Sequence, residues 1–344
     1  MIFEQIADGG CRSYIVGCAD ACVAALIDPA QRQIDRYAAL AAKRGLRIAD
    51  IVETHTHADH FTGARTAAER FGAPIVMHRD APAPFVDLRL DDGDSLRIGA
   101  LRMTAMHTPG HTADSMSFLA GDRVFTGDTL LIKATGRTDL PTGDPNALYD
   151  SLFGRLLKLD PATIVHPAHE YKGREATTIG KELAENPRLS VRDRGDFVAM
   201  MNRLNLSAPT HLTEALRVNM TGGASVAQLL SEAAADVPFL SLDALRQWSE
   251  ERRNDVVILD VRERDSFEDG HVPGARHLPR GLLELKVNEA FPDPTVRIVT
   301  YCDFGRISTL AAATLRRMGF QRVSALDGGM IDWRERGFDV ETGA

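Results

Sequence analysis

The chain has 344 residues, which is long enough for two domains that each bury a core. Hydrophobic residues make up 44% and charged residues 26%, which argues against extended disorder. The formal net charge of −8 provides no global positive field for nucleic acid. No apolar run reaches the roughly 18 residues of a membrane span. The start of the chain has no signal-peptide pattern and the four cysteines suggest no disulfide framework, so we expect a cytoplasmic protein.

Short apolar segments and helical patterns follow one another in the first two thirds of the chain. Strands are predicted at residues 14–17, 23–28, 48–52, 74–77, 101–106, 115–119, 123–125 and 163–166. Helices are predicted at residues 31–44, 59–71 and 146–159, and from residue 181 into the 204–206 region. Residues that can bind metals stand at or just after several strand ends, where loops on a rigid scaffold commonly carry catalytic groups.

Strand and helix alternate in the last third, after a glycine- and alanine-rich stretch that ends near Pro238. Helices are predicted at residues 242–252, 264–268 and 308–318, and strands at 256–259, 297–301 and 322–325. Such alternation predicts a small parallel α/β domain. We therefore expect two domains, residues 1–237 and 238–344.

The stretch T-H-T-H-A-D-H at residues 54–60 follows a buried-type strand and concentrates imidazole and carboxylate groups. Further residues of these types follow at intervals along the chain. The full set is His55, His57, Asp59, His60, His111, Asp128 and His169. Neutral imidazole nitrogen and carboxylate oxygen are the usual protein ligands of zinc and iron. The first two histidines can serve one metal and the Asp-His pair a neighbouring one, with Asp128 bridging, so spacing alone leaves one or two metals open.

This pattern resembles the metallo-β-lactamase superfamily, whose fold is an αββα sandwich with metal held between two sheets. The stretch F-T-G-D-T-L-L-I-K-A-T-G-R-T-D-L-P-T-G-D-P-N-A-L-Y-D-S-L at 125–152 is similar to the persulfide dioxygenases, also called sulfur dioxygenases. So are H-P-A-H-E-Y-K-G-R at 166–174, N-P-R-L at 186–189 and the segment 197–206. The resemblance covers about residues 10–222.

The resemblance implies one Fe(II) per chain, held by His55, His111 and Asp128. Such a triad leaves coordination positions open for a substrate sulfur and O₂. The resemblance then makes His57, Asp59, His60 and His169 pocket residues that orient the ligands. It also implies that glutathione persulfide is oxidised by O₂ to sulfite and glutathione. Glutathione carries carboxylates, and the nearest candidates to bind it are Arg137, Tyr171, Lys172 and Arg174.

Three motifs in the last third resemble a rhodanese, or sulfurtransferase, domain over about residues 238–342. They are L-D-V-R-E at 259–263, G-H-V-P-G-A at 270–275 and Y-C-D-F-G-R-I-S at 301–308, with L-D-G-G-M-I-D-W at 326–333 in support. Cys302 ends a predicted strand, and its loop opens a helix, so backbone N–H groups can stabilise an anionic sulfur that carries a persulfide. The loop residues are Asp303, Phe304, Gly305, Arg306, Ile307 and Ser308. Many rhodaneses have Arg where this chain has Ile307, which puts efficient use of thiosulfate in doubt.

The fusion of the two domains links them chemically, because a persulfide is substrate at one site and the carried form at the other. Sulfite and thiosulfate are the further expected partners, the direction of sulfur transfer stays open, and we expect a homodimer. The alternative is a glyoxalase-II-like thioester hydrolase with two metals and an accessory rhodanese module. A binding module with a structural metal is a third reading, although structural zinc sites are usually closed and cysteine-rich. Cys11, Cys18 and Cys22 are expected to serve packing.

Overall fold

The computed structural model describes residues 1–204, 206–207, 212–251, 253 and 255–343 of the chain. These form two compact units, Met1–Gly223 and Ala224–Ala344. Each unit has its own buried core.

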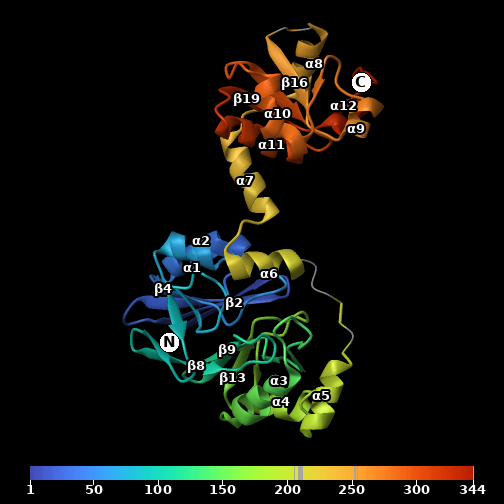
Figure 1. The fold of residues 1–344 in the computed structure, drawn as a ribbon. Coiled ribbons are helices and arrows are strands. Elements are labelled where there is room, and N and C mark those ends of the chain that lie inside the picture. The colour runs from blue at the N-terminus through green and yellow to red at the C-terminus, as the bar shows by residue number, and fades with distance from the viewer. Residues whose placement is uncertain (205, 208–211, 252, 254, 344) are drawn as a thin grey trace. The chain divides into compact units, whose positions relative to one another are not determined.

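The first unit contains two six-stranded sheets that lie between two layers of helices (Figure 1). In order across the first sheet, the strands are β1 (Ile2–Asp8), β2 (Cys11–Cys18), β3 (Val23–Ile27), β4 (Arg47–Val52), β5 (Ile75–His78) and β6 (Leu88–Leu90). Across the second sheet they are β14 (Thr177–Thr178), β13 (Ile164–Pro167), β10 (Arg123–Gly127), β9 (Met116–Ala120), β8 (Leu101–His107) and β7 (Ser95–Ile98). A small hairpin is made by β11 (Leu130–Leu131) and β12 (Ala134–Thr135).

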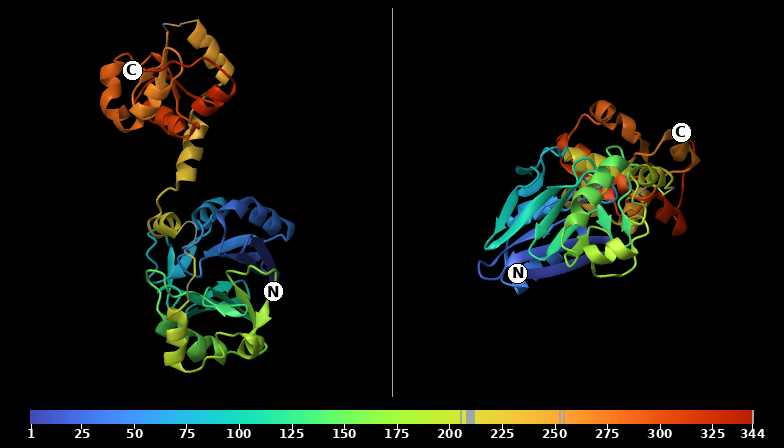
Figure 2. Two further views of the ribbon diagram at one scale, coloured as in Figure 1. Left: turned by 90° about the vertical axis from the view of Figure 1, so that its right-hand side faces the viewer. Right: turned by 90° about the horizontal axis from the view of Figure 1, so that it is seen from below.

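Helices cover the outer face of each sheet, and the left view in Figure 2 shows the same order of layers in this unit. On the first sheet lie α1 (Ile34–Lys43), which follows a 3-10 turn at Gln31–Gln33, and α2 (Ala64–Phe71). On the second lie α3 (Pro145–Tyr149), its π and 3-10 continuations Asp150–Arg155 and Leu156–Lys158, α4 (Ile179–Glu185) and α5 (Arg194–Asn202). The last helix of the unit is α6 (Leu212–Thr221).

Side-chain alternation along the strands builds these layers. Ile15 of β2 packs in the cluster under α1 and α2, whereas the next residue, Val16, packs in the cluster between the two sheets. Because successive strand residues point to opposite faces, one apolar strand can contribute to both cores. The αββα sandwich predicted from the sequence is confirmed.

The second unit is a parallel five-stranded sheet with helices on both faces. Across the sheet the strands are β15 (Phe239–Leu240), β19 (Arg322–Leu326), β18 (Arg297–Tyr301), β16 (Val256–Asp260) and β17 (Arg276–His277). Its helices are α7 (Val226–Asp236), α8 (Leu242–Glu250), α9 (Arg264–Asp269), a 3-10 turn at Arg280–Leu282, α10 (Leu283–Ala290), α11 (Arg306–Arg317) and α12 (Met330–Glu335). The predicted parallel α/β domain is confirmed.

The division between the units lies at Gly223/Ala224, 14 residues before the expected boundary at 237/238. The difference is α7, which begins with a capping box between Ser225 and Gln228 and packs against α11. Ala233 and Val237 are buried in this arrangement. The alanine-rich stretch before Pro238 therefore forms a helix that packs with the second unit.

Several elements differ from their predicted bounds. The helix expected from residue 59 begins at Ala64, because Asp59 and His60 turn their side chains toward each other and toward the site. The helical stretch expected from residue 181 breaks at Asn186-Pro187 into α4 and α5. Residue 205 in that stretch and residue 252 at the end of the expected 242–252 helix lie outside the described residues. Within the described part of the chain, no helix is long and apolar enough to cross a membrane.

Candidate active site

The loop that follows β4 is fixed by two buried carboxylates. The Thr54 backbone N–H donates to Asp28 Oδ1 (2.7 Å) and its hydroxyl donates to Asp28 Oδ2 (2.9 Å). Two residues on, the Thr56 backbone N–H and hydroxyl both donate to Asp114 Oδ2, at 3.0 and 2.6 Å. Hydrogen bonds to ionised groups are among the stronger ones in proteins, so the T-H-T-H segment is held rigidly at the end of its strand.

Three side chains converge beside this loop. One ligand atom each from His55, His111 and Asp128 lies within 4.8 Å of the other two. Their strands are β4, β8 and β10, so two sheets contribute to one point. Among the described residues, His55 Nε2 is buried and has no hydrogen-bond partner. A buried nitrogen without a partner is costly unless something binds it, and two imidazoles with one carboxylate are a donor set that iron and zinc accept. The residues present therefore fit a metal.

The protonation of His55 and Asp128 also suits metal binding. Burial lowers the pKa of His55 well below its ordinary value, so the ring is neutral and carries a lone pair. The ring of His111 is oriented by a contact between its Nδ1 and the Arg137 carbonyl oxygen (2.9 Å). Burial acts to raise the pKa of Asp128, but the neighbouring His169 outweighs it and the pKa lies well below its ordinary value. The carboxylate is therefore ionised.

His169 joins Asp128 to a second group of residues. Its Nδ1 lies 2.7 Å from Asp128 Oδ1, and its Nε2 lies 2.8 Å from Asp59 Oδ2. His60 Nδ1 contacts the other Asp59 oxygen at 3.1 Å, and Cys11 Sγ lies 3.5 Å from His169 Nε2. Ligand atoms of Cys11, Asp59, His60 and His169 lie within 4.8 Å of one another. Cys11 was expected to serve packing, and it lies instead at the edge of the site.

His57 lies in a third buried group. Its Nε2 is 2.9 Å from Glu53 Oε2 and 3.5 Å from Asp28 Oδ1. Burial acts to lower the pKa of His57, but these two carboxylates raise it well above its ordinary value. The first and second histidines of the motif therefore have different surroundings: His55 lies with His111 and Asp128, whereas His57 faces two carboxylates.

Asn219 of α6 forms hydrogen bonds with the backbone of the loop after β4. Its Nδ2 donates to the backbone carbonyl oxygens of His57 and His60, each at 2.8 Å, and its Oδ1 accepts from the Thr62 backbone N–H at 3.2 Å. These bonds satisfy backbone groups of a segment that forms no helix or strand. α6 therefore contributes to the shape of the site although it carries no ligand.

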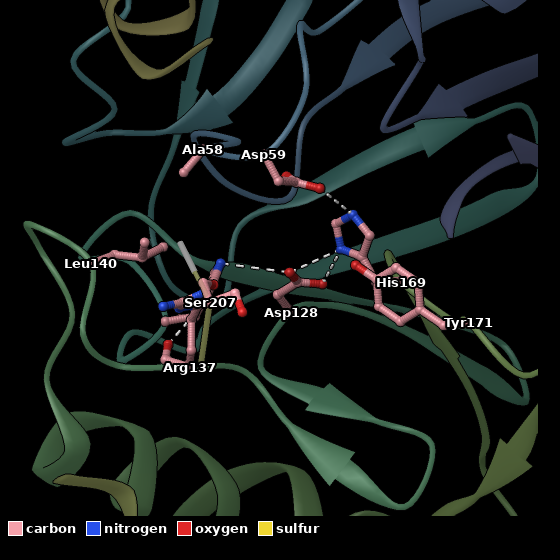
Figure 3. Close-up of a pocket in the computed structure, with 9 residues that line it drawn as sticks. Ala58, Asp59, Asp128, Arg137, Leu140, His169, Tyr171 and Ser207 are labelled. Carbon is pink, nitrogen blue, oxygen red and sulfur yellow. Dashed lines mark hydrogen bonds and ion pairs between the residues drawn. The ribbon is translucent and has the colours of Figure 1, made fainter. Parts of the chain in front are cut away.

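A cavity of about 340 Å³ opens beside the candidate metal-binding group, which consists of His55, His111 and Asp128. Its walls are formed by Ala58, Asp59, His111, Asp128, Arg137, Leu140, His169, Tyr171 and Ser207. Figure 3 shows His169 between Asp59 and Asp128, with the Tyr171 ring beside His169 and Arg137 on the other side of Asp128. A smaller apolar cavity of about 160 Å³ adjoins it and shares Ala58 and Leu140.

The four residues expected to bind glutathione lie in different surroundings. Tyr171 is 75% exposed and its ring stacks on His169 at 5.9 Å between centroids. Arg137 lines the cavity, but its guanidinium forms a two-bond pair with Asp139 and donates to the Ser207 carbonyl oxygen.

Lys172 and Arg174 do not line the cavity among the described residues. Arg174 pairs with the buried Glu170 carboxylate through Nε (2.8 Å) and a terminal nitrogen (2.6 Å). The Lys172 backbone N–H donates to the same carboxylate. The positive charge of Arg174 is thus balanced by Glu170.

In the second unit, Cys302 follows β18 and its loop leads into α11, as the sequence suggested. The thiol is 2% exposed, and its sulfur lies 3.4 Å from the Ser308 backbone nitrogen and 3.5 Å from the Ser308 hydroxyl. Gly305 has φ +79°, and a Cβ there would lie 2.9 Å from the Gly328 carbonyl oxygen. The tight loop around the sulfur therefore requires glycine at this position.

The other loop residues form the surface around this thiol. Phe304 and Ile307 are exposed at 70% and 47%, and Arg306 is also exposed. Asp303 Oδ1 accepts from Arg262 (3.0 Å), whose guanidinium is also paired with the fully buried Asp260. The surface beside Cys302 therefore presents apolar side chains, and Arg262 holds the loop through its bond to Asp303.

Sequence reasoning did not assign Asp28, Thr54, Thr56, Asp114 and Asn219 to the site. The alternation of threonine with histidine in T-H-T-H was one available signal, because threonine hydroxyls beside metal ligands commonly make hydrogen bonds. Asp28 and Asp114 could not be paired with these threonines from sequence, since the pairs are separated by 26 and 58 residues.

Two protein families match the chain. The metallo-beta-lactamase superfamily matches residues 7–169, and the rhodanese-like domain matches residues 241–336. "Persulfide dioxygenase ETHE1, mitochondrial" of Homo sapiens is 36% identical over 214 residues, which are 61% of this chain and 84% of that protein. "Probable metallo-hydrolase BURPS1710b_2304" of Burkholderia pseudomallei is 34% identical over 55% of this chain and 77% of its own length.

Two solved structures are also similar. The crystal structure of ETHE1 from Myxococcus xanthus has 39% identity and a TM-score of 0.63, and covers 65% of this chain and 100% of its own. A metallo-beta-lactamase structure from Staphylococcus aureus has a TM-score of 0.62 over 95% of this chain and 98% of its own. At 22% identity, the latter shows the fold alone.

Proposed function

Because the chain belongs to the persulfide dioxygenase family of the metallo-β-lactamase superfamily and carries a rhodanese-like domain, we propose that it oxidises glutathione persulfide to sulfite. The observation that carries this proposal is the three-residue group of His55, His111 and Asp128 beside a cavity. Glutathione persulfide, O₂ and water would give glutathione, sulfite and two protons. The sulfane sulfur loses four electrons, which one O₂ accepts.

We assign one Fe(II) to these three residues. Bound there, iron would supply open coordination positions at which a persulfide sulfur and O₂ meet. The protein's own contribution is orientation: His169 holds the Asp128 carboxylate through two close contacts, at 2.7 and 2.9 Å. Asp59 holds the other side of the His169 ring. Ligands fixed in this way lose little freedom when substrate binds.

The residues that line the cavity can contact the polar groups of glutathione. Tyr171 offers an exposed hydroxyl, and Arg137 lies on the other side of Asp128. The geometry favours these two residues over Lys172 and Arg174 as contacts for glutathione, since they line the cavity. The adjoining apolar cavity gives room for part of the thiol carrier that the main cavity does not hold.

In the second unit, Cys302 is the proposed sulfur carrier. Its thiolate would attack the sulfane sulfur of thiosulfate, so that the S–S bond breaks and sulfite leaves. The resulting Cys302 persulfide would pass its outer sulfur to the glutathione thiolate, which regenerates the Cys302 thiolate. The same steps in reverse would consume sulfite. The Ser308 N–H near the sulfur supports an anionic form of this residue.

The test is O₂ uptake by the Fe(II)-loaded chain with glutathione persulfide, with sulfite counted as product. We expect one O₂ consumed per sulfite formed. Removing a residue that only orients a ligand typically lowers metal affinity by roughly 10- to 100-fold. His55→Ala removes a proposed ligand itself, so it should lower metal affinity by more than this and should also abolish O₂ uptake. The same variant should keep Cys302-dependent sulfur transfer, which controls for the second unit, and a cooperative urea unfolding transition of the first unit, which controls for the folding of the mutated unit. An iron-loaded wild-type chain without O₂ uptake would contradict the proposal.

A second candidate is a two-metal thioester hydrolase, which the adjacent group of Cys11, Asp59, His60 and His169 favours. It predicts two metals per chain and turnover of thioesters without O₂. Metal analysis of the loaded chain, together with thioester assays in the absence of O₂, separates the two candidates. The homodimer and the cytoplasmic location remain proposals, with the oligomeric state open to measurement by light scattering.

A further inference from the structure

The Thr54 hydroxyl lies between a buried carboxylate and the first proposed metal ligand. Thr54 Oγ1 is 2.9 Å from Asp28 Oδ2 and 2.9 Å from His55 Nδ1. All three residues are buried, with 1% exposure for Thr54 and His55 and 4% for Asp28. Within the described residues, the three side chains thus form a continuous chain that ends at the unpartnered His55 Nε2.

The number of protons available determines which atom donates in the Asp28–Thr54 and Thr54–His55 hydrogen bonds. A carboxylate can only accept, and Asp28 receives the Thr54 backbone N–H on one oxygen and the hydroxyl on the other. The hydroxyl has a single proton, which is therefore directed at Asp28. The contact between Thr54 Oγ1 and His55 Nδ1 is then a hydrogen bond only if Nδ1 carries the ring proton. Among the described residues Nε2 has no hydrogen-bond partner that would hold a proton there, so the ring proton stays on Nδ1 and Nε2 keeps its lone pair.

The surroundings hold this arrangement in place. Asp28 has φ +48°, a left-handed conformation that residues other than glycine rarely adopt. Its backbone carbonyl accepts from the Ser13 hydroxyl (2.7 Å), and its N–H donates to the Val52 carbonyl oxygen (2.8 Å). Gly127 leaves space on the other side, because a Cβ there would lie 2.6 Å from Thr54 Oγ1.

His111 reaches the same tautomer through a different partner. Its Nδ1 lies 2.9 Å from the Arg137 backbone carbonyl oxygen, which can only accept. His111 Nε2 is then the nitrogen that faces Asp128, 3.6 Å from Oδ2. In both histidines of the group, a hydrogen-bond acceptor beside Nδ1 therefore determines the tautomer. For His111 the acceptor is a backbone carbonyl oxygen, and for His55 it is the Thr54 hydroxyl oxygen, whose own proton is donated to Asp28.

We propose that Asp28 and Thr54 are positioning residues that fix the tautomer of His55 and thereby present Nε2 to the metal. The proposal rests on the assignment of His55 as a metal ligand in the proposed function. Neither residue touches the metal or the substrate. Asp28 acts through Thr54, two hydrogen bonds away from Nε2, so its removal should change metal binding before it changes anything in the cavity.

The first experiment uses the full metal-free chain with ¹⁵N-labelled histidine. Long-range ¹H–¹⁵N spectra report which ring nitrogen is protonated, and the His55 signals are assigned by their loss in His55→Ala. We expect the Nδ1–H tautomer in the wild type and a mixture of tautomers in Thr54→Val. Competition with a chelator should show Fe(II) affinity reduced by about 10- to 100-fold in Thr54→Val, the range for outer partners of a ligand. Thr54→Ser keeps the hydroxyl and should restore both the tautomer and most of the affinity.

Asp28→Asn gives a sharper test. The oxygen of the amide would still accept the Thr54 backbone N–H, which places the amide nitrogen opposite the Thr54 hydroxyl. The amide would then donate to Thr54 Oγ1, and the hydroxyl proton would turn to His55 Nδ1. His55 should therefore change to the Nε2–H tautomer, with a loss of affinity at least equal to that of Thr54→Val.

Thr56→Val is the matched control, because it removes the same kind of threonine–aspartate bond in the same loop without touching a histidine ring. It should lower the unfolding midpoint about as much as Thr54→Val while leaving the His55 tautomer unchanged. A wild-type His55 protonated at Nε2, or a Thr54→Val chain with unchanged tautomer and affinity, overturns the inference. A wild-type chain that binds no metal overturns the proposed function instead, so the two failures are distinguishable.

Discussion

Histidines in this protein differ sharply in what their ring nitrogens meet. His55 is neutral with a bare nitrogen, whereas both nitrogens of His169 face carboxylates. Burial acts to lower the pKa of His169, but Asp128 and Asp59 raise it well above its ordinary value. One residue type thus supplies both a proposed metal ligand and a charged brace within one site. The two rings differ in protonation because they have different partners, and burial strengthens the electrostatic interaction with those partners.

His166 represents a third environment, outside the metal-binding group. Its ring lies among Phe3, Tyr14 and Phe125, with centroids 4.6 to 5.4 Å away. Both ring nitrogens are buried without a hydrogen-bond partner among the described residues. Burial lowers the pKa of His166 to about 4.

This environment predicts a pH dependence of stability. Between pH 6.5 and 4 the unfolded chain binds a proton at His166 that the folded chain does not, so stability falls as pH falls through this range. At 1.36 kcal/mol per pKa unit the full loss is about 3 kcal/mol, complete below pH 4. His166→Phe should therefore show a shallower decline than the wild type in urea unfolding of the first unit between pH 7 and 4. Parallel declines in the two proteins would contradict the assignment.

At the scale of elements, each of β4, β8 and β10 is followed by a loop that carries one proposed ligand. The loop after β4 contains no helix until Ala64, and side chains from elsewhere replace the missing backbone bonds. Asp28, Asp114 and Asn219 serve this purpose. A rigid loop positioned by a sheet is a general way to fix catalytic groups within small tolerances.

Helix α7 offers a prediction at the same scale. It packs on α11, and its own Ala233 and the C-cap residue Val237 are buried, so the second unit should depend on it. A fragment of residues 224–344 should unfold at higher urea than a fragment of residues 238–344, with a difference of roughly 2–3 kcal/mol from the apolar surface covered. Circular dichroism at increasing urea measures both. Equal stability would place α7 outside the folded unit and return the boundary to residue 237/238.

At the scale of the whole molecule, two proposed sites of sulfur chemistry share one chain. Each unit has its own core, and each proposed site is built from residues of a single unit. The metal-binding group draws on both sheets of the first unit, and the thiol loop draws on β18, α11 and the Gly328-Gly329 turn of the second. The two activities should therefore be separable by mutation.

Cys302→Ser tests this separation. The variant should lose sulfur transfer from thiosulfate to glutathione, while O₂ uptake with glutathione persulfide stays at the wild-type rate. His55→Ala is the reciprocal control, with sulfur transfer kept and O₂ uptake lost. If Cys302→Ser also abolished O₂ uptake from supplied glutathione persulfide, the two-site description would be wrong.

Sequence alone determined the sandwich fold, the parallel second domain and the residues whose chemistry suits metal and sulfur. Local patterns carry this information, because ligands and loop residues stand at strand ends within short motifs such as residues 54–60 and 301–308. Only the tertiary structure decided which polar groups meet. Cys11 and His169 are 158 residues apart in sequence and 3.5 Å apart in space, and the Asp28–Thr54–His55 chain joins the segments that follow β3 and β4. Such contacts depend on how sheets pack, and the same packing decides whether a histidine is neutral or charged.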